Sequence, residues 1–192
     1  MDTATGPAPI HAVPALRRLY LARSAFAIAW AVLLVLTASS VGPATSIGAL
    51  TVVLLVLYPL VDVGAAVVDL RSAGAARPSA ALRLTIALSL LAAVGLALAV
   101  GSGLPAVLRV WGVWAVTVGI VQLVLAIRRR ALGGQWAQIL SGGISVLAGG
   151  SFIVQAGASS ASLGSVAGYA TLGGIFFLIS AVRLHRAATV TR

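Results

Sequence analysis

Residues 105–130, PAVLRVWGVWAVTVGIVQLVLAIRRR, form a largely apolar run in which Arg109 is the one charged residue before the three arginines at its end. A helix needs roughly 20 apolar residues to cross a hydrocarbon core about 30 Å thick, and this run is long enough. Arginine clusters in short loops favour the cytoplasmic side of a membrane. The stretch therefore predicts a transmembrane helix whose carboxyl end is cytoplasmic.

The same pattern extends over the whole chain. Six apolar stretches lie near residues 20–40, 45–68, 82–100, 105–127, 136–154 and 162–182. Twelve of the thirteen basic residues, all arginines, fall at one end of these stretches, in four clusters of three. The clusters are Arg17, Arg18 and Arg23; Arg71, Arg77 and Arg83; Arg128, Arg129 and Arg130; and Arg183, Arg186 and Arg192. This distribution predicts six spans with both termini in the cytoplasm.

The composition agrees with a membrane protein. Hydrophobic residues make up 60% of the chain and charged residues 8%, with a mean hydropathy of +1.11, which a water-soluble fold of 192 residues could not cover. A net charge of +10 would suggest nucleic acid in a soluble protein. Here the arginines face the anionic cytoplasmic leaflet, where each is worth about 1 kcal/mol. The expected partners are thus the lipid bilayer and its anionic lipids, and not nucleic acid.

The first span has an alternative interpretation as a secretory signal peptide. Arg17 and Arg18 precede the apolar run, and the small residues 37–40 follow it. The basic residues begin late, however, and Gly42-Pro43 is followed at once by another span. We expect the first span to be retained, because its cleavage would leave an odd number of spans that fits the arginine distribution less well.

The predicted fold is an all-α, polytopic membrane protein with six transmembrane helices built from three repeated helical hairpins. The hairpins lie near 20–71, 82–130 and 136–186, within a transmembrane domain at 17–186. Residues 1–16 are expected to form a flexible cytoplasmic tail and residues 187–192 a short cytoplasmic tail. An axis along the membrane normal should relate the repeats, giving approximate threefold pseudosymmetry.

The repeats share a register at the cytoplasmic ends of the even spans. Trp114, Gly119 and Arg128 recur at identical intervals as Tyr169, Gly174 and Arg183. In the first hairpin the same intervals select Leu57, Asp62 and Arg71, while a slip of two residues selects Gly64 as the glycine. The register of that hairpin therefore stays open.

Small residues predict where helices pack closely. Since lipid is as apolar as the spans, the hydrophobic effect does not drive helices together, and they associate through close van der Waals packing. The predicted packing residues are Ala137, Ser141, Ser145 and Gly149, spaced by four, and the pair Gly164 and Gly168. These faces are expected to pack within the chain, with contact between copies as the alternative. Trp111 and Trp136 are expected near the headgroups, as is typical of aromatic residues at span ends.

Asp62 is the acidic side chain that lies well inside a predicted span, roughly 13 Å along the helix from Arg71. A carboxylate in hydrocarbon is costly, so it should face the bundle interior and either pair with a donor or stay protonated. Tyr58, one turn earlier, or an arginine could be that donor. Asp62 and Tyr58 are therefore the candidate intramembrane polar site, either functional or merely satisfied.

Other chemistry finds little support in the sequence. There is no cysteine, and His11 and His185 are too few and too far apart for a metal site. No serine–histidine–acid arrangement, phosphate-binding glycine loop or carboxylate pair occurs. We expect no catalytic residue, no metal and no cofactor, and hence no enzyme. Arg109, near the outer end of its span, is expected to extend toward the outer headgroups.

Residues 134–142 carry a family resemblance. Gly134, Trp136, Gln138 and Gly142 follow the pattern G-x-W-x-Q-x3-G that opens the fifth span of HdeD-like acid-resistance membrane proteins, and the chain resembles that family over roughly 20–186. The resemblance implies a six-span protein of the bacterial inner membrane, linked to survival in acid and without established catalysis. It also implies that the motif residues are packing determinants. It assigns no role to Asp62.

Three functions follow as hypotheses. The first is a non-enzymatic HdeD-like membrane protein of acid or general stress response. The second is a proton or small-solute carrier that uses Asp62. The third is an accessory subunit that docks on a larger membrane complex through its small-residue stripe, or a homo-oligomer. Loss of flux on replacing Asp62 would favour the carrier, and a stable co-purifying partner would favour the accessory role.

Overall fold

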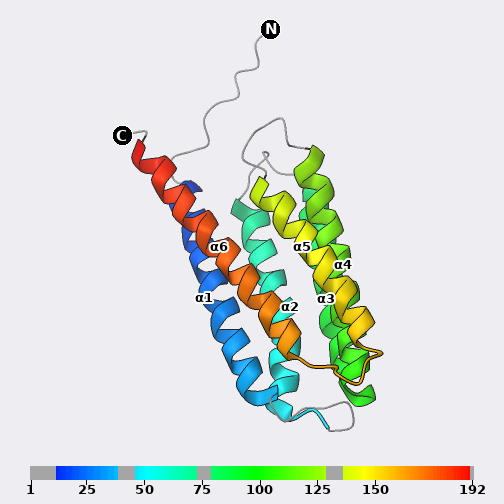
Figure 1. The fold of residues 1–192 in the computed structure, drawn as a ribbon. Coiled ribbons are helices and arrows are strands. Elements are labelled where there is room, and N and C mark those ends of the chain that lie inside the picture. Colours follow the sequence, from blue (N-terminus) through cyan, green and yellow to red (C-terminus); the bar gives the residue numbers. More distant parts are fainter. Residues whose placement is uncertain (1–11, 39–45, 73–78, 129–135, 191–192) are drawn as a thin grey trace.

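The structure is a computed structural model that describes residues 12–38, 46–72, 79–128 and 136–190 (Figure 1). These residues form six long helices and one short 3-10 turn, with no strand among them. The elements are α1 (Ala12–Ala38), α2 (Ala49–Ser72), α3 (Ser79–Ala99), η2 (Val100–Ser102), α4 (Leu104–Arg128), α5 (Trp136–Gln155) and α6 (Gly164–Val190). The predicted all-α, polytopic fold is confirmed.

Five of the helices are long and apolar enough to cross a membrane by length and composition. They are α1, α2, α3, α4 and α6. Helix α5 has 20 residues, and its segment Ile139–Gln155 is an apolar helix of somewhat shorter length. At 1.5 Å per residue, 20 residues extend about 30 Å, which matches the hydrocarbon thickness.

The helices pack most closely between hairpins and less closely within them. Helix α1 packs on α6, α2 on α3, and α4 on α5, while α1–α2, α3–α4 and α5–α6 touch less extensively. Close and loose neighbours thus alternate around the bundle, and the alternation repeats three times. This pattern agrees with three related hairpins arranged about a common axis.

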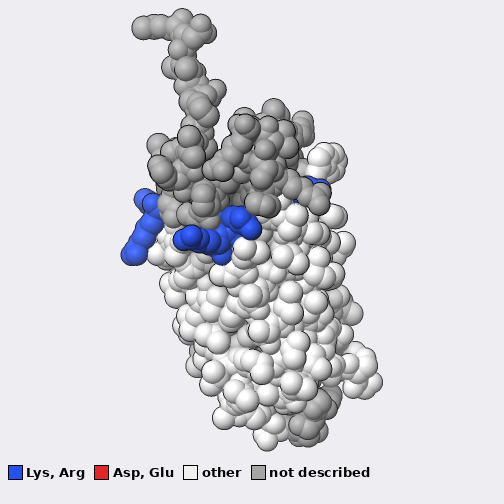
Figure 2. Space-filling view, turned by 90° about the vertical axis from the view of Figure 1, so that its left-hand side faces the viewer, with Lys and Arg blue, Asp and Glu red and all other residues white. Residues whose placement is uncertain are grey.

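The described arginines other than Arg109 gather at one end of the bundle, where α1 begins and α6 ends (Figure 1, Figure 2). The exposed ones at this arginine-rich end are Arg18, Arg71, Arg83, Arg128 and Arg183. Arg109 is exposed near the start of α4, which lies at the opposite end. Below the arginines, the described surface seen in Figure 2 carries no charged side chain. This is the expected surface of a bundle with one charged rim and an apolar belt.

Helix α1 begins at Ala12 and therefore overlaps the tail predicted for residues 1–16. Pro14 stands in the first turn, where its missing N–H removes no helical hydrogen bond. Helix α6 likewise continues to Val190, into the tail predicted for 187–192. The apolar run marks only the part of a helix inside the membrane, and alanine and arginine favour its continuation beyond.

The half of the bundle away from the arginines is filled by a solid core. Side chains there are at most 2% exposed, among them Trp30, Leu34, Leu55, Leu96, Leu104, Leu108, Trp111, Phe152 and Val166. Trp30 stacks on Trp111 with ring centroids 5.5 Å apart, and Trp114 meets Trp111 edge-on at 5.4 Å. Trp111 is thus wholly buried, so its predicted place at the headgroups is wrong. Its helix turns that side toward the bundle interior, where the indole packs on other rings.

A glycine seam joins α4 and α5. A methyl group added at Gly112 would meet the Gly149 carbonyl oxygen at 2.6 Å, and one added at Gly119 would meet the Gly142 carbonyl oxygen at 2.9 Å. On each helix the two glycines are two turns apart, so they line one face. The backbones approach this closely because no side chain separates them. The prediction that the small face of α5 packs within the chain is confirmed for Ser145 and Gly149.

Candidate intramembrane polar site

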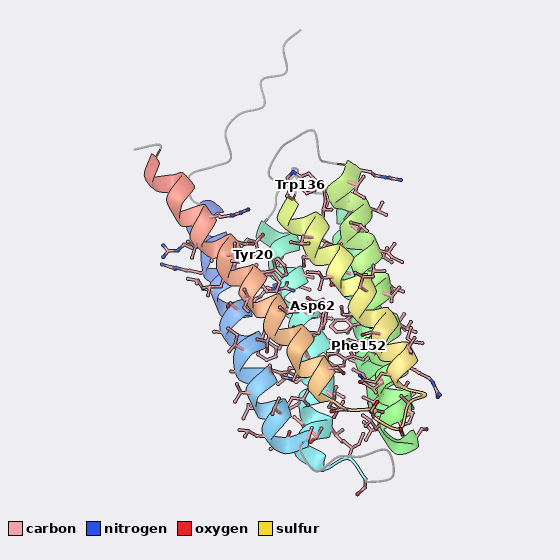
Figure 3. All side chains as sticks on the ribbon, viewed as in Figure 1. Tyr20, Asp62, Trp136 and Phe152 are labelled. Carbon is pink, nitrogen blue, oxygen red and sulfur yellow. The ribbon has the colours of Figure 1, made fainter. Side chains whose placement is uncertain are left out.

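The site is built around an ion pair between two neighbouring helices. Arg23 Nη2 of α1 donates to Asp62 Oδ1 of α2 at 2.5 Å. The side chains are only partly accessible, with 25% of Arg23 and 13% of Asp62 exposed. Figure 3 shows Asp62 inside the bundle, at about the middle of its height. The acid therefore faces the interior and takes an arginine as its donor, which is one of the outcomes that the sequence left open.

The second carboxylate oxygen extends the contact to two more helices. Ser89 Oγ of α3 donates to Asp62 Oδ2 at 2.9 Å, and Trp114 Nε1 of α4 donates to Ser89 Oγ at 3.1 Å. Both oxygens of Asp62 are thus hydrogen-bonded, as a buried carboxylate requires. Four consecutive helices are linked by one chain of polar contacts in the order Arg23, Asp62, Ser89 and Trp114.

Helix α6 contacts this chain through an aromatic ring. The Arg23 guanidinium carbon lies 4.3 Å from the centroid of the Phe177 ring. A cation over a ring face is attracted by the negative charge of the π-system, and guanidinium groups are suited to this stacking. Arg23 is therefore held from two sides, by a carboxylate of α2 and by a ring of α6.

A cavity of about 120 Å³ adjoins the ion pair. It lies in the arginine-rich half of the bundle, between the diverging α5 and α6, whose ribbons separate toward that end in Figure 1. Its polar lining comes from five helices and comprises Tyr20, Arg23, Tyr58, Asp62, Trp114, Gln122, Ser141, Ser145, Tyr169 and Ser180. Three of its lining residues, Tyr58, Trp114 and Tyr169, pack on the buried rings Trp111 and Phe152 of the core.

Tyr58 lines the cavity one turn before Asp62, on the same face of α2. Its ring packs on Trp30, with centroids 4.6 Å apart, and also contacts Phe26, Trp111 and Trp114. Within the described part of the chain, its hydroxyl makes no hydrogen bond to Asp62. The structure therefore places both predicted residues at the same site, but the acid is satisfied by Arg23 and Ser89.

The far wall of the cavity holds a second polar pair. The Ser145 hydroxyl of α5 and the Tyr169 hydroxyl of α6 are 2.9 Å apart. Tyr169 occupies the repeat position of Trp114, and both aromatic residues bond a serine on the preceding odd helix. The two contacts are thus equivalent pairs in two hairpins.

The residues missed by the sequence analysis are Arg23, Ser89 and Tyr169. Arg23 was grouped with the headgroup arginines, although it stands more than one turn deeper than Arg18. An arginine followed directly by a helical apolar run could have indicated an interior partner for Asp62. Ser89 gave no signal, because one serine in an apolar span is common.

The remaining predicted residues fall in several places. Gly142 lies in the glycine seam, Ser141 lines the cavity, and Trp136 is 79% exposed at the arginine-rich end (Figure 3). Gly164 and Gly168 are exposed, and no atom of another helix lies within 4 Å of a methyl group added at either of them. Their predicted role in helix packing within the chain is therefore wrong, since α6 uses Gly174 against α1 instead. Gly134 and the side chains of Ala137 and Gln138 lie outside the described residues.

No group of three or more metal-ligating side chains occurs among the described residues. Comparison with known proteins finds no family model, no curated protein and no solved structure that matches the chain. Fold and site therefore define the class by themselves: a multi-pass helical membrane protein with an acid–arginine pair inside its bundle.

Proposed function

We propose that the chain is a non-enzymatic, HdeD-like protein of the bacterial inner membrane that serves in acid or general stress response. Its functional centre is the pair of Arg23 and Asp62. The observation that carries the proposal is this pair, which lies within the membrane-spanning helices and beside a cavity on the arginine-rich side. A carboxylate is the group in this interior that acid can neutralise directly.

Protonation of Asp62 would change the charge inside the bundle. The pair is neutral as a whole, whereas protonated Asp62 leaves the positive charge of Arg23 without its counter-ion. An uncompensated charge in a low-dielectric interior is costly, so the bundle would relieve it by moving Arg23 or by taking up an anion. Since the polar chain through Asp62 joins four helices, α2 included, a proton on Asp62 would act on the whole arrangement.

Two features of the chain support the membrane and family assignments. The arginine clusters favour a cytoplasmic arginine-rich end, which would let the cavity sample cytoplasmic pH. The motif of Gly134, Trp136, Gln138 and Gly142 resembles that of HdeD-like proteins. Gly142 packs against the backbone of α4 and leaves no room for a side chain, which is a sufficient reason for glycine in such a motif.

The test is a pH titration of intrinsic tryptophan fluorescence in the purified protein. Trp114 reports on Asp62 through Ser89, so the wild type should show a spectral change as the pH falls. Asp62→Asn should abolish that change, because asparagine has no proton to gain. Arg109→Gln, at the opposite end of the bundle, is the matched control and should titrate like wild type. A titration that persists in Asp62→Asn would contradict the proposal.

A second function, a proton or small-solute carrier, is favoured by the cavity that reaches Asp62 from one side. The filled core of the other half speaks against a continuous path. Liposomes with a trapped pH dye would decide between them. A proton flux in wild type that falls in Asp62→Asn would establish the carrier. Liposomes that stay impermeable to protons with either variant would favour the stress-response function.

A further inference from the structure

We propose that the cavity beside Asp62 is filled with water, opens toward the arginine-rich end and is closed toward the other end. The ion pair would then be in contact with the aqueous phase on one side of the membrane. Such a cavity takes small neutral molecules that both donate and accept hydrogen bonds, with water as the resident one. It needs no proton on Asp62, and it goes beyond the proposed response function because it would stand if that function failed.

The cavity extends along the helices toward the arginines. On α6 its lining runs from Tyr169 to Ser180, which spans about 16 Å at 1.5 Å per residue. Ser180 is three residues before Arg183, and on α1 the lining residue Tyr20 is two residues after Arg18. Arginines at the ends of spans mark the level of the headgroups. One end of the cavity therefore lies within about one helical turn of that level.

The opposite end of the cavity is backed by the aromatic core. Figure 3 shows Tyr20 on the arginine-rich side of Asp62 and Phe152 on the other side. Phe152 packs on the lining residue Tyr169, and Trp111 packs on the lining residue Trp114. Both backing rings are at most 2% exposed. The arginine-rich end is thus the side from which water enters.

The charge and the hydrogen-bonding groups of the wall match a neutral dipolar molecule. Arg23 and Asp62 are the charged residues of the lining, so the wall is neutral overall and would present a like charge to an ion of either sign. Asp62 accepts two hydrogen bonds and has room for about two more, and the Arg23 guanidinium has N–H groups to spare. The hydroxyls of Tyr58 and Ser141 have no hydrogen-bond partner among the described residues. Water can donate to the spare acceptors and accept from the spare donors.

The size of the cavity agrees with water and excludes larger occupants. A volume of about 120 Å³ corresponds to about four waters at roughly 30 Å³ each. Sites for drug-sized molecules begin at about 300 Å³. A lipid chain in the cavity would leave the polar groups of its wall unpaired in apolar surroundings, which is costly. Ionisable residues within spans instead face the bundle interior or a water-filled cavity.

Gly173 provides a place to block the cavity. It lines the cavity, and a methyl group added there would have the Tyr58 hydroxyl, at 3.9 Å, as its nearest neighbour. A larger side chain would therefore grow into the cavity. Gly173 lies one turn from Tyr169 toward the arginine-rich end, and so between the entrance and the Ser145–Tyr169 contact.

The experiment measures the reaction of single cysteines with iodoacetamide, a small neutral amide, in membrane vesicles at neutral pH. The chain has no cysteine of its own. Ser145→Cys places one on the cavity wall, and Leu147→Cys places one at about the same depth on the outward face of α5. Ser145→Cys should react at least about tenfold faster, because the thiolate is the reactive form and apolar surroundings suppress it. Exposed area alone would give the reverse order, since Leu147 is 77% exposed and Ser145 is 8% exposed.

The side of entry is measured with vesicles of both orientations. Glutathione inside the vesicles consumes reagent that crosses the membrane, so that reaction proceeds from the outside. Arg128→Cys marks the arginine-rich end and Arg109→Cys marks the other end. Ser145→Cys should react in the orientation that exposes Arg128→Cys and stay unreacted in the orientation that exposes Arg109→Cys.

Blocking the cavity is the last arm of the experiment. Gly173→Leu should slow the reaction of Ser145→Cys to the rate of Leu147→Cys, while Ser180→Cys, nearer the entrance, keeps its rate. Gly168→Leu, on the outward face of α6, is the matched control and should change neither.

Ser141→Cys is a second reporter of the cavity, and its exchange removes no hydrogen bond among the described residues. It should react like Ser145→Cys, which guards against a loss of folding in that variant. Equal rates for Ser145→Cys and Leu147→Cys, entry from the Arg109 side, or a rate that Gly173→Leu leaves unchanged would each overturn the proposal.

Discussion

Helix α5 has two neighbours, and it meets them in opposite ways. Against α4 it uses Gly142 and Gly149, and the backbones come so close that a single methyl group would collide with a carbonyl oxygen. Against α6 it uses one hydroxyl pair, Ser145 and Tyr169, and leaves a cavity beside it. The contact with α4 fixes the position of α5, and the looser contact with α6 leaves space for the polar cavity. A bundle can thus hold a polar cavity in a membrane if the helices that border it are anchored on their other side.

The largest expected effect comes from breaking the glycine seam. Gly112→Ala should destabilise the protein by about 3 kcal/mol, because the added methyl group would overlap the backbone of α5, which cannot rotate away. The midpoint of thermal unfolding in detergent measures this change.

The matched control for this substitution is Gly150→Ala, directly beside Gly149. A methyl group there has no atom within 4 Å, so the exchange should be neutral or stabilise the helix by up to about 1 kcal/mol. Equal losses of unfolding stability in Gly112→Ala and Gly150→Ala would show that the close approach of α4 and α5 makes no specific contribution to stability.

The next effect comes from separating the ion pair that borders the cavity. Arg23→Gln should destabilise the fold by about 2 kcal/mol, less than the several kcal/mol of a fully buried pair, because both side chains are partly accessible. Asp62→Asn should cost less, since the long arginine side chain can reach toward the headgroups. Combining the two changes should recover part of the loss. A double-mutant cycle of unfolding free energies gives the coupling, and strictly additive losses would contradict a direct interaction.

The sequence predicted the packed part of the molecule better than the cavity. Span length, arginine placement and the spacing of Ser145 and Gly149 are local patterns, and each follows from the physics of one helix in lipid. The arginine partner of Asp62 depends on how two helices are rotated about their axes, which no local pattern specifies. For the same reason Trp111 was expected at a headgroup and lies in the core, and Gly168 was expected in a contact and faces outward.

A smaller effect should come from the two equivalent serine–aromatic pairs. Ser145→Ala removes one hydrogen bond across the α5–α6 gap and should cost about 0.5–1 kcal/mol, typical of such bonds in membranes. Ser89→Ala should cost about 1–1.5 kcal/mol, because it also deprives the Asp62 carboxylate of a donor while leaving its Arg23 partner in place. Thermal unfolding of both variants provides the comparison. An equal cost would mean that the Ser89 bond to the charged group adds no stability.

The smallest effect should come from the outward face of α6. Gly168→Ala should change unfolding by less than about 1 kcal/mol and in the stabilising direction, because no atom lies near the added methyl group and alanine favours a helix. Gly174→Ala, two turns or so along the same helix, is its matched partner and should destabilise, since the methyl group would press on Ile28, Ala27 and the Ser24 carbonyl of α1. Both are measured by thermal unfolding, with the oligomeric state followed by light scattering.

If Gly168→Ala instead destabilised the protein and shifted its mass in solution, the exposed Gly164–Gly168 face would have to pack on a second copy. The loose side of the bundle, from α5 across the cavity to α6, would then owe part of its stability to a neighbouring molecule, and the contrast with the glycine seam would weaken accordingly.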